Sequence, residues 1–150
     1  MIPTLLEIEV REYYNEYIVP GASVILYSTL IDWDDQSDAI SEGFTDENGI
    51  VVFSNLESYV HYVDVWEQNH DNYALRYEDV GFIRTPEILP HRINRFIAWV
   101  DSVDHGKGVV KGIRRPIINK FERKATDKRQ PEAGSGTQDW QELYKIRSGK

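Results

Sequence analysis

The stretch from Ser41 to Phe53 constrains the fold of this chain more than any other part of the sequence. It reads Ser-Glu-Gly-Phe-Thr-Asp-Glu-Asn-Gly-Ile-Val-Val-Phe, with turn residues between two strand-forming ends. Asp46 and Asn48 can hydrogen-bond their own backbone, and Gly49 can adopt a positive φ without steric cost. Branched and aromatic residues from 50 to 53 favour a pleated strand. The pattern predicts a β-hairpin.

Alternating apolar and polar residues predict further strands on both sides of this stretch. The expected strands cover residues 3–11, 22–31, 60–66 and 93–103, and a short edge strand is expected at 73–77. Loops are expected at 32–42, 68–72 and 85–92. About seven short strands in roughly 100 residues are typical of an all-β, antiparallel, immunoglobulin-like sandwich.

The charge of the chain divides it into two parts. Residues 1–104 hold 5 basic and 20 acidic side chains, a net charge of −15, whereas residues 105–150 hold 12 basic and 5 acidic side chains, a net charge of +7. This asymmetry predicts a β-sandwich domain at 1–104 and a basic C-terminal arm at 105–150, called the arm below. The two parts are expected to face different partners, or each other.

Four short segments carry a resemblance to known families. They are Pro20-Gly21-Ala22-Ser23-Val24-Ile25-Leu26-Tyr27, then Thr45 to Phe53, then Asn55-Leu56, and then Tyr62-Val63-Asp64-Val65. The pattern resembles transthyretin-like and carboxypeptidase-regulatory-like domains, and it is similar to the B-type repeats of collagen-binding adhesins. The resemblance covers about residues 5 to 103. It implies a prealbumin-like sandwich, a bacterial surface or envelope setting, and a supporting or binding role.

The chain departs from these families in two respects. The adhesin repeats often form an internal bond between a lysine and an asparagine, but no lysine precedes Lys107 here. An intradomain bond of that kind is therefore excluded. The transthyretin-related hydrolases end in Tyr-Arg-Gly-Ser, whereas this chain ends in Tyr144-Lys145-Ile146-Arg147-Ser148-Gly149-Lys150. Their enzymatic role does not carry over.

Catalytic and cofactor motifs are missing from the sequence. The chain has no cysteine, which excludes disulfides, zinc thiolates and thiol nucleophiles. The four histidines, His61, His70, His91 and His105, lack zinc-ligand spacing. No Gly-x-Ser-x-Gly elbow, Ser-x-x-Lys pair or glycine-rich phosphate loop occurs. We therefore predict that the protein is not an enzyme and needs no cofactor.

An acidic loop and a set of aromatic residues are candidate binding sites. Asp32, Asp34, Asp35 and Asp38 could supply oxygens to calcium, although Ser37 stands where an EF-hand needs glycine. A solvated loop without metal is the preferred interpretation. The aromatic residues could form a ligand platform, but packing in the core or on a sheet face explains them better, with Trp33 as an expected exposed contact. They are Trp33, Trp66, Trp99, Tyr27, Tyr59 and Tyr62.

The arm contains two segments that mix basic and apolar residues. Short helices are expected near 116–124, after Pro116, and near 138–146, with glycine-rich and polar linkers before each. Apolar residues at helical spacing would form anchors for docking into a partner's groove. The expected partner-binding residues are Arg114, Arg115, Ile117, Ile118, Phe121, Trp140, Leu143 and Tyr144. A disordered, solvated arm is the alternative.

These observations predict a non-catalytic structural or interaction module that joins a larger protein assembly through its arm. Nucleic acid or an anionic membrane surface would explain the basic residues but not Trp140, Leu143 and Tyr144. The alternative function is a surface-exposed adhesion or ligand-binding domain, with or without calcium. No transmembrane segment or signal peptide is apparent. The expected location is the cell envelope, or a virion or cytoplasmic assembly if Met1 is the natural start.

Overall fold

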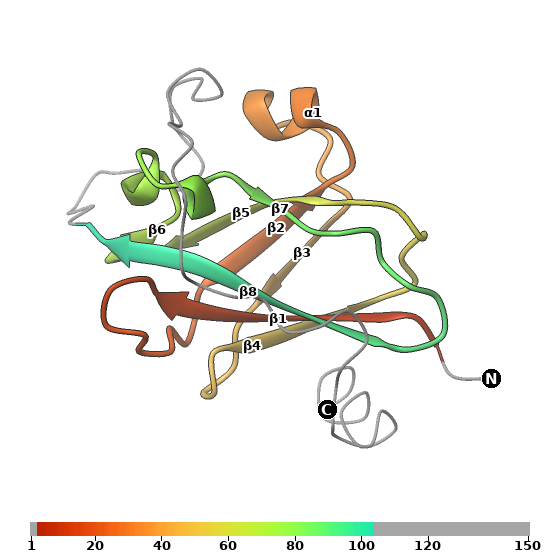
Figure 1. Cartoon of the computed structure of the whole chain (residues 1–150), viewed down its shortest axis with the longest axis horizontal. Coiled ribbons are helices and arrows are strands. Elements are labelled where there is room, and N and C mark those ends of the chain that lie inside the picture. Colours follow the sequence, from red (N-terminus) through yellow and green to blue (C-terminus); the bar gives the residue numbers. More distant parts are fainter. Residues whose placement is uncertain (1–2, 104–150) are drawn as a thin grey trace.

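The computed structural model describes residues 3–103, and the predicted arm helices and anchors lie outside this part. It contains eight strands and three short helices (Figure 1). The strands are β1 (Leu5–Glu12), β2 (Ser23–Tyr27), β3 (Ser41–Phe44), β4 (Ile50–Ser54), β5 (Tyr62–Glu67), β6 (His70–Asp71), β7 (Ile83–Arg84) and β8 (Ile93–Ser102). The helices are α1 (Leu30–Asp35) and two 3-10 turns, η1 (Tyr73–Leu75) and η2 (Asp79–Gly81).

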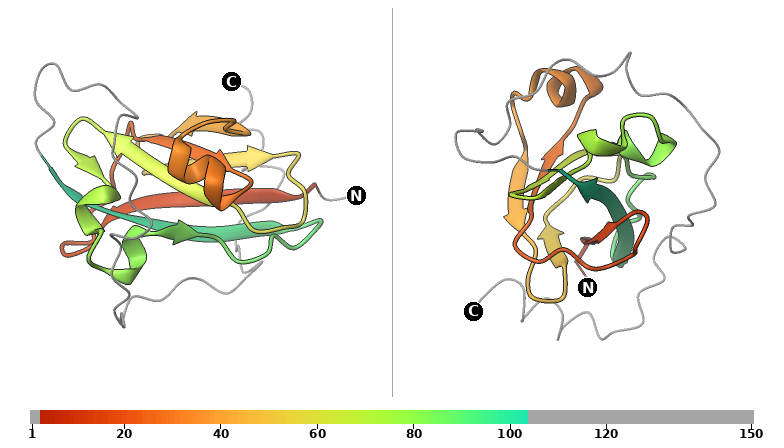
Figure 2. Two further views of the ribbon diagram at one scale, coloured as in Figure 1. Left: turned by 90° about the horizontal axis from the view of Figure 1, so that it is seen from above. Right: turned by 90° about the vertical axis from the view of Figure 1, so that its left-hand side faces the viewer.

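The strands form two layers that are joined at one end. One layer has the order β3-β2-β5-β6, with β7 also paired to β5, and the other has the order β8-β1-β4. The long strand β8 belongs to both layers, because its last residues pair with β6. All pairs are antiparallel except β1 with β8, which is parallel. The prediction of an all-β sandwich is confirmed (Figure 2).

The core lies between the two layers and comes from alternate residues of the strands. Leu6, Ile8 and Val10 of β1 are buried there, as the sequence alternation predicts. They pack with apolar residues from the other strands, among them Val24, Leu26, Val51, Phe53, Val63, Val65, Phe96, Ala98 and Val100. The four apolar clusters formed by described residues draw on both layers, with members from β1, β2, β4, β5, β7 and β8. The sandwich thus has a core of its own.

The prediction of a hairpin at Ser41 to Phe53 is wrong in its pairing. The turn itself forms as expected, since Asp46 Oδ1 accepts hydrogen bonds from the backbone N–H of Asn48 and Ile50, and Gly49 has a φ of 76°. However, β3 pairs with β2 and β4 pairs with β1. The chain therefore crosses from one layer to the other at this turn. Turn residues specify a reversal of the chain but not the strands that pair beyond it.

Four other boundaries also differ from the predictions. The strand expected at 22–31 ends at Tyr27, and the loop expected at 32–42 includes part of α1 and the first two residues of β3. The loop expected at 68–72 contains β6, and η1 replaces the edge strand expected at 73–77. A side-chain cap explains α1, since Thr29 Oγ1 accepts a hydrogen bond from the N–H of Asp32. At η1, Asp71 Oδ1 accepts a hydrogen bond from the N–H of Ala74.

Candidate interaction surface

The outer face of β3, β2 and β5 presents its side chains in ordered cross-strand rows. Phe44 lies opposite Ser23, which lies opposite Trp66 on β5. In the next row, Glu42 lies opposite Ile25, which lies opposite Asp64. Directly opposite residues in antiparallel strands point to the same side of the sheet, so each row is a set of neighbours.

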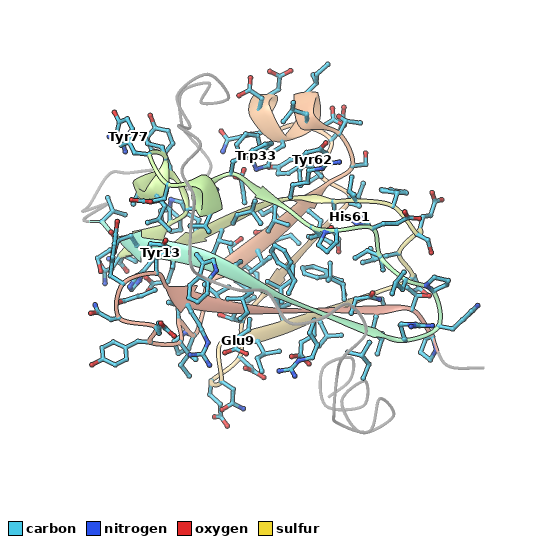
Figure 3. The ribbon with its side chains drawn as sticks, viewed as in Figure 1. Glu9, Tyr13, Trp33, His61, Tyr62 and Tyr77 are labelled. Atoms are coloured by element: carbon cyan, nitrogen blue, oxygen red, sulfur yellow. The ribbon has the colours of Figure 1, made fainter. Side chains whose placement is uncertain are left out.

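Helix α1 covers one end of this outer face. Trp33 is fully buried, and its indole N–H donates a hydrogen bond to the backbone carbonyl of Val63, with an N···O distance of 2.9 Å. Its ring lies 5.1 Å from that of Phe82, and Tyr62 belongs to the same apolar cluster (Figure 3). The prediction that Trp33 is an exposed contact is therefore wrong, because α1 turns this side chain onto the sheet.

The other end of the face exposes apolar and acidic side chains together. Phe44 is 63% exposed and Ile40, just before β3, is 42% exposed, while Ile25 and Trp66 are half-buried. Glu42 is exposed between them, and Asp64 is buried beneath. We call Ile25, Ile40, Glu42, Phe44, Asp64 and Trp66 the β3 face. Large exposed apolar residues grouped with charges mark a surface that suits a partner with apolar and basic groups.

Strand β3 is also an edge of the sheet. Among the described strands its only hydrogen-bonded neighbour is β2. An edge strand presents unpaired backbone N–H and C=O groups, which can accept an added strand. On α1, the Ile31 side chain is 70% exposed beside Asp32 and Asp35.

A histidine that lies between two carboxylates connects β1 of one layer to β5 and β6 of the other. His70 Nδ1 lies 2.7 Å from Glu67 Oε1, and His70 Nε2 lies 2.6 Å from Glu12 Oε2. Burial alone would lower the pKa of His70, but the hydrogen bonds and charges of Glu67 and Glu12 outweigh burial and raise it. In turn, the hydrogen bond from His70 is the main reason that the pKa of Glu12 is lowered. The cluster is an ion pair network that ties β1 to β6.

His61 lies in a different environment, inside the sandwich. Its side chain is fully buried, and neither ring nitrogen makes a hydrogen bond in the described part of the chain. The ring stacks on Tyr59, with the centroids 4.6 Å apart. Burial lowers the pKa of His61 and outweighs the opposing influence of the Tyr59 backbone and the Glu57 carboxylate. His61 is therefore a neutral core residue at neutral pH.

The structure separates most of the site residues considered in the sequence. Asp32, Asp34 and Asp35 lie on α1 and Asp38 lies in the loop after it. Within residues 3–103, no group of three or more histidine, aspartate or glutamate side chains is arranged to hold a metal ion.

Of the aromatic set, Trp33, Trp99 and Tyr27 are buried, so packing accounts for them. No helix in the described residues has the length and apolar character needed to cross a bilayer.

The His70 cluster and the β3 face were not anticipated from the sequence. Glu12 and His70 are 58 residues apart, and no local motif joins them. The β3 face had one detectable signal, since Glu42 and Phe44 alternate with smaller residues at the start of the expected hairpin, whereas Ile40 lies in the loop expected at 32–42. Their exposure depends on where α1 ends, which the sequence pattern did not reveal.

Comparisons with known proteins find only distant structural similarity. No family model and no curated protein matches the chain. Similar solved structures include the major pilin subunit BcpA of Bacillus cereus, with 13% identity, a TM-score of 0.41, and 67% of this chain and 30% of the pilin covered. They also include 5-hydroxyisourate hydrolase of Klebsiella pneumoniae, with 11% identity, a TM-score of 0.39, and 71% of this chain and 97% of the hydrolase covered.

A third similar structure is catechol 1,2 dioxygenase of Acinetobacter radioresistens, with 12% identity, a TM-score of 0.34, and 75% of this chain and 57% of the enzyme covered. The chain spans less than a third of the pilin subunit. A pilin subunit and two enzymes appear together, and all three TM-scores are below 0.5, so these similarities select neither a family nor a function.

Proposed function

We propose that this protein is a non-catalytic interaction module that joins a larger protein assembly through its arm. The observation that carries the proposal is a β-sandwich whose strands form an apolar core between the two layers. The arm adds eight anchor residues, which are apolar side chains and arginines in two segments. Apolar residues that a domain core does not require are available to bind a partner.

The sandwich also gives the arm a fixed starting point. The last residues of β8 pair with β6, and the backbone N–H of Val103 donates to the carbonyl of Asn69 over 2.7 Å. The chain is thus held by hydrogen bonds up to Val103, the last residue that the structure describes. A binding segment that follows an ordered strand loses less conformational entropy on binding than a segment that follows a frayed strand.

The sequence resemblance to adhesin repeats supports a bacterial surface or envelope assembly as the setting. The alternative of an adhesion domain that binds through Trp33 is weakened, since this side chain is buried. The basic charge of the arm favours an acidic partner surface, and the terminal Trp140, Leu143 and Tyr144 favour an apolar groove within it.

The proposal is tested by partner capture with the full chain and a variant of its terminal segment. Trp140→Ala, Leu143→Ala and Tyr144→Ala together should abolish capture of the partner from the native source. The matched control, Gln138→Ala, Gln141→Ala and Glu142→Ala, changes the same segment but should leave capture intact. The captured protein is then purified and its binding to both variants is measured directly. Equal affinity for the two triple variants would refute the terminal anchor.

A further inference from the structure

We propose that residues 114–121 of the arm bind the β3 face of the same chain. The β3 face exposes Phe44 and Ile40 beside the carboxylate of Glu42, with Asp64 beneath them. The segment at 114–121 reads Arg-Arg-Pro-Ile-Ile-Asn-Lys-Phe. The inference assigns the first anchor segment to the chain's own domain and leaves the terminal segment, with Trp140, Leu143 and Tyr144, to bind the partner of the proposed function.

The chemistry of the two surfaces is complementary. Arginine presents a planar fork of donors that matches a carboxylate in a bidentate pair, and Arg114 and Arg115 could each meet an acidic group of this face. Ile117, Ile118 and Phe121 would cover the exposed apolar area around Phe44. Residues 1–104 carry a net charge of −15 and the arm carries +7, so association of the two parts also reduces the repulsion within the domain.

The sheet register places Asp101, near the end of β8, on the same cross-strand row as Phe44. The row runs from Phe44 through Ser23 and Trp66 to Asp71, and from there to Asp101 near the end of β8. Neighbouring strands are about 4.8 Å apart, so the four steps from β3 to β8 span roughly 19 Å. The arm therefore follows a strand whose end lies on a row that reaches the β3 face.

The chain between these points has a suitable length. Residues 104–113 include Gly106, Gly108 and Gly112, and ten residues in a glycine-rich coil have a root-mean-square span of about 17 Å. A linker whose span matches the distance between two sites gives the highest effective concentration, on the order of millimolar. Contact between the arm and its own domain is therefore favoured over contact with a second copy at micromolar protein concentration.

A spin label in the arm tests this arrangement in the full chain. The protein has no cysteine, so Asn119→Cys provides a single labelling site between the anchor residues. The label should broaden the backbone amide resonances of Ser41 to Phe44, reducing their intensities by more than half. In a background of Arg114→Glu and Arg115→Glu the intensities should recover. The control Lys128→Glu and Arg129→Glu has the same change in net charge and should leave the broadening unchanged.

The other outcomes each overturn the proposal. Absence of broadening on β3, or equal broadening with both charge variants, would show that residues 114–121 do not bind this face. Broadening that appears only when a labelled chain is mixed with an isotopically enriched, unlabelled one would assign the site to a second copy. The Trp140, Leu143 and Tyr144 alanine variant should keep the broadening, so that failure of partner capture and failure of this contact can be told apart.

Discussion

Glu12 and His70 lie in different layers of the sandwich, yet their side chains are 2.6 Å apart. Glu12 ends β1, and His70 begins the short strand β6 that pairs with β8. Glu67 Oε1 is hydrogen-bonded to the other imidazole nitrogen, Nδ1, and the Asn15 amide donates a hydrogen bond to Glu12 Oε1. Both carboxylates can accept a hydrogen bond from the imidazole only when both of its ring nitrogens are protonated. This arrangement makes the link between the layers dependent on pH.

The first prediction concerns the pH dependence of this link. The pKa of His70 is raised in the folded state, so its stabilising contribution is complete below the unfolded pKa of about 6.5 and is lost as the pH rises through the folded pKa. His70→Gln should therefore cost about 1–2 kcal/mol at pH 6 and much less at pH 9. Urea unfolding at both values measures the difference. His91→Asn, which replaces an exposed histidine outside this cluster, serves as the control variant.

The second prediction is an opposite pH dependence from His61. Its pKa is lowered in the folded state, so the unfolded chain binds more protons below about pH 6.5 and stability falls as the pH decreases. His61→Leu removes the unpaired ring nitrogens and keeps a similar volume. We expect the variant to resist acid better, with a gain of about 1 kcal/mol per pH unit below 6.5. Parallel unfolding curves for variant and wild type between pH 7 and 5 would contradict this explanation.

The sequence predicted the strands better than their pairing. Leu6, Ile8 and Val10 alternate with polar residues and do face the core, because a period of two is a local property of the chain. The pairing of β3 with β2 and of β4 with β1 depends on contacts between distant segments, which turn residues do not encode. The same limit applies to His70, whose partner Glu12 has no local signal.

Trp33 illustrates a second limit of prediction from sequence, which is that the composition around a residue does not reveal whether that residue is buried. Its neighbours Asp32, Asp34 and Asp35 suggested a solvated loop, yet the cap at Thr29 starts a helix that turns the indole onto the sheet. The acidic residues lie around the helix, and the one apolar ring in their midst contacts Val63 on a strand thirty residues later. Composition indicated the exposed side of this segment, and only the tertiary contact reveals its buried side.

The third prediction follows from that contact. Trp33→Ala removes a fully buried ring and leaves the Val63 carbonyl without its indole donor, so it should cost about 3–5 kcal/mol of unfolding free energy. Trp33→Phe should cost less, because it keeps most of the ring. Ile31→Ala is the matched control on the same helix, and its 70% exposed side chain should change stability by no more than about 0.5 kcal/mol. A small loss of unfolding free energy for Trp33→Ala would mean that packing of this ring does not hold α1 against the sheet.

The fourth prediction is that calcium does not stabilise the protein. Asp32 and Asp34 are two positions apart on α1, which places them about 200° apart around the helix axis, so their carboxylates point to different sides. A ligand at one hundred times its Kd would raise the unfolding free energy by about 2.7 kcal/mol. Thermal melting with millimolar calcium, and with magnesium as control, should give the same Tm. A calcium-specific rise that Asp32→Asn removes would restore the acidic loop as a metal site.

The fifth prediction distinguishes two reasons for glycine in the turns, which are a positive φ and a lack of space for a Cβ atom. Gly49 has a φ of 76°, and a Cβ there would lie 2.9 Å from Ile18 Cβ and 3.2 Å from the Val10 carbonyl oxygen. Gly21 has a similar φ of 71°, but a Cβ there would meet no atom within 4 Å. Gly21→Ala should therefore cost only the backbone strain, about 1–2 kcal/mol.

Gly49→Ala adds a collision to the same strain, because its Cβ would press on the segment that connects β1 to β2. We expect a loss at least twice that of Gly21→Ala, measured by urea unfolding under identical conditions. The extra loss would reflect the close approach of the turn between β3 and β4 to Ile18 and Val10, where the chain passes from one layer to the other. Equal losses for the two variants would show that this turn can move away from the β1 layer at little cost.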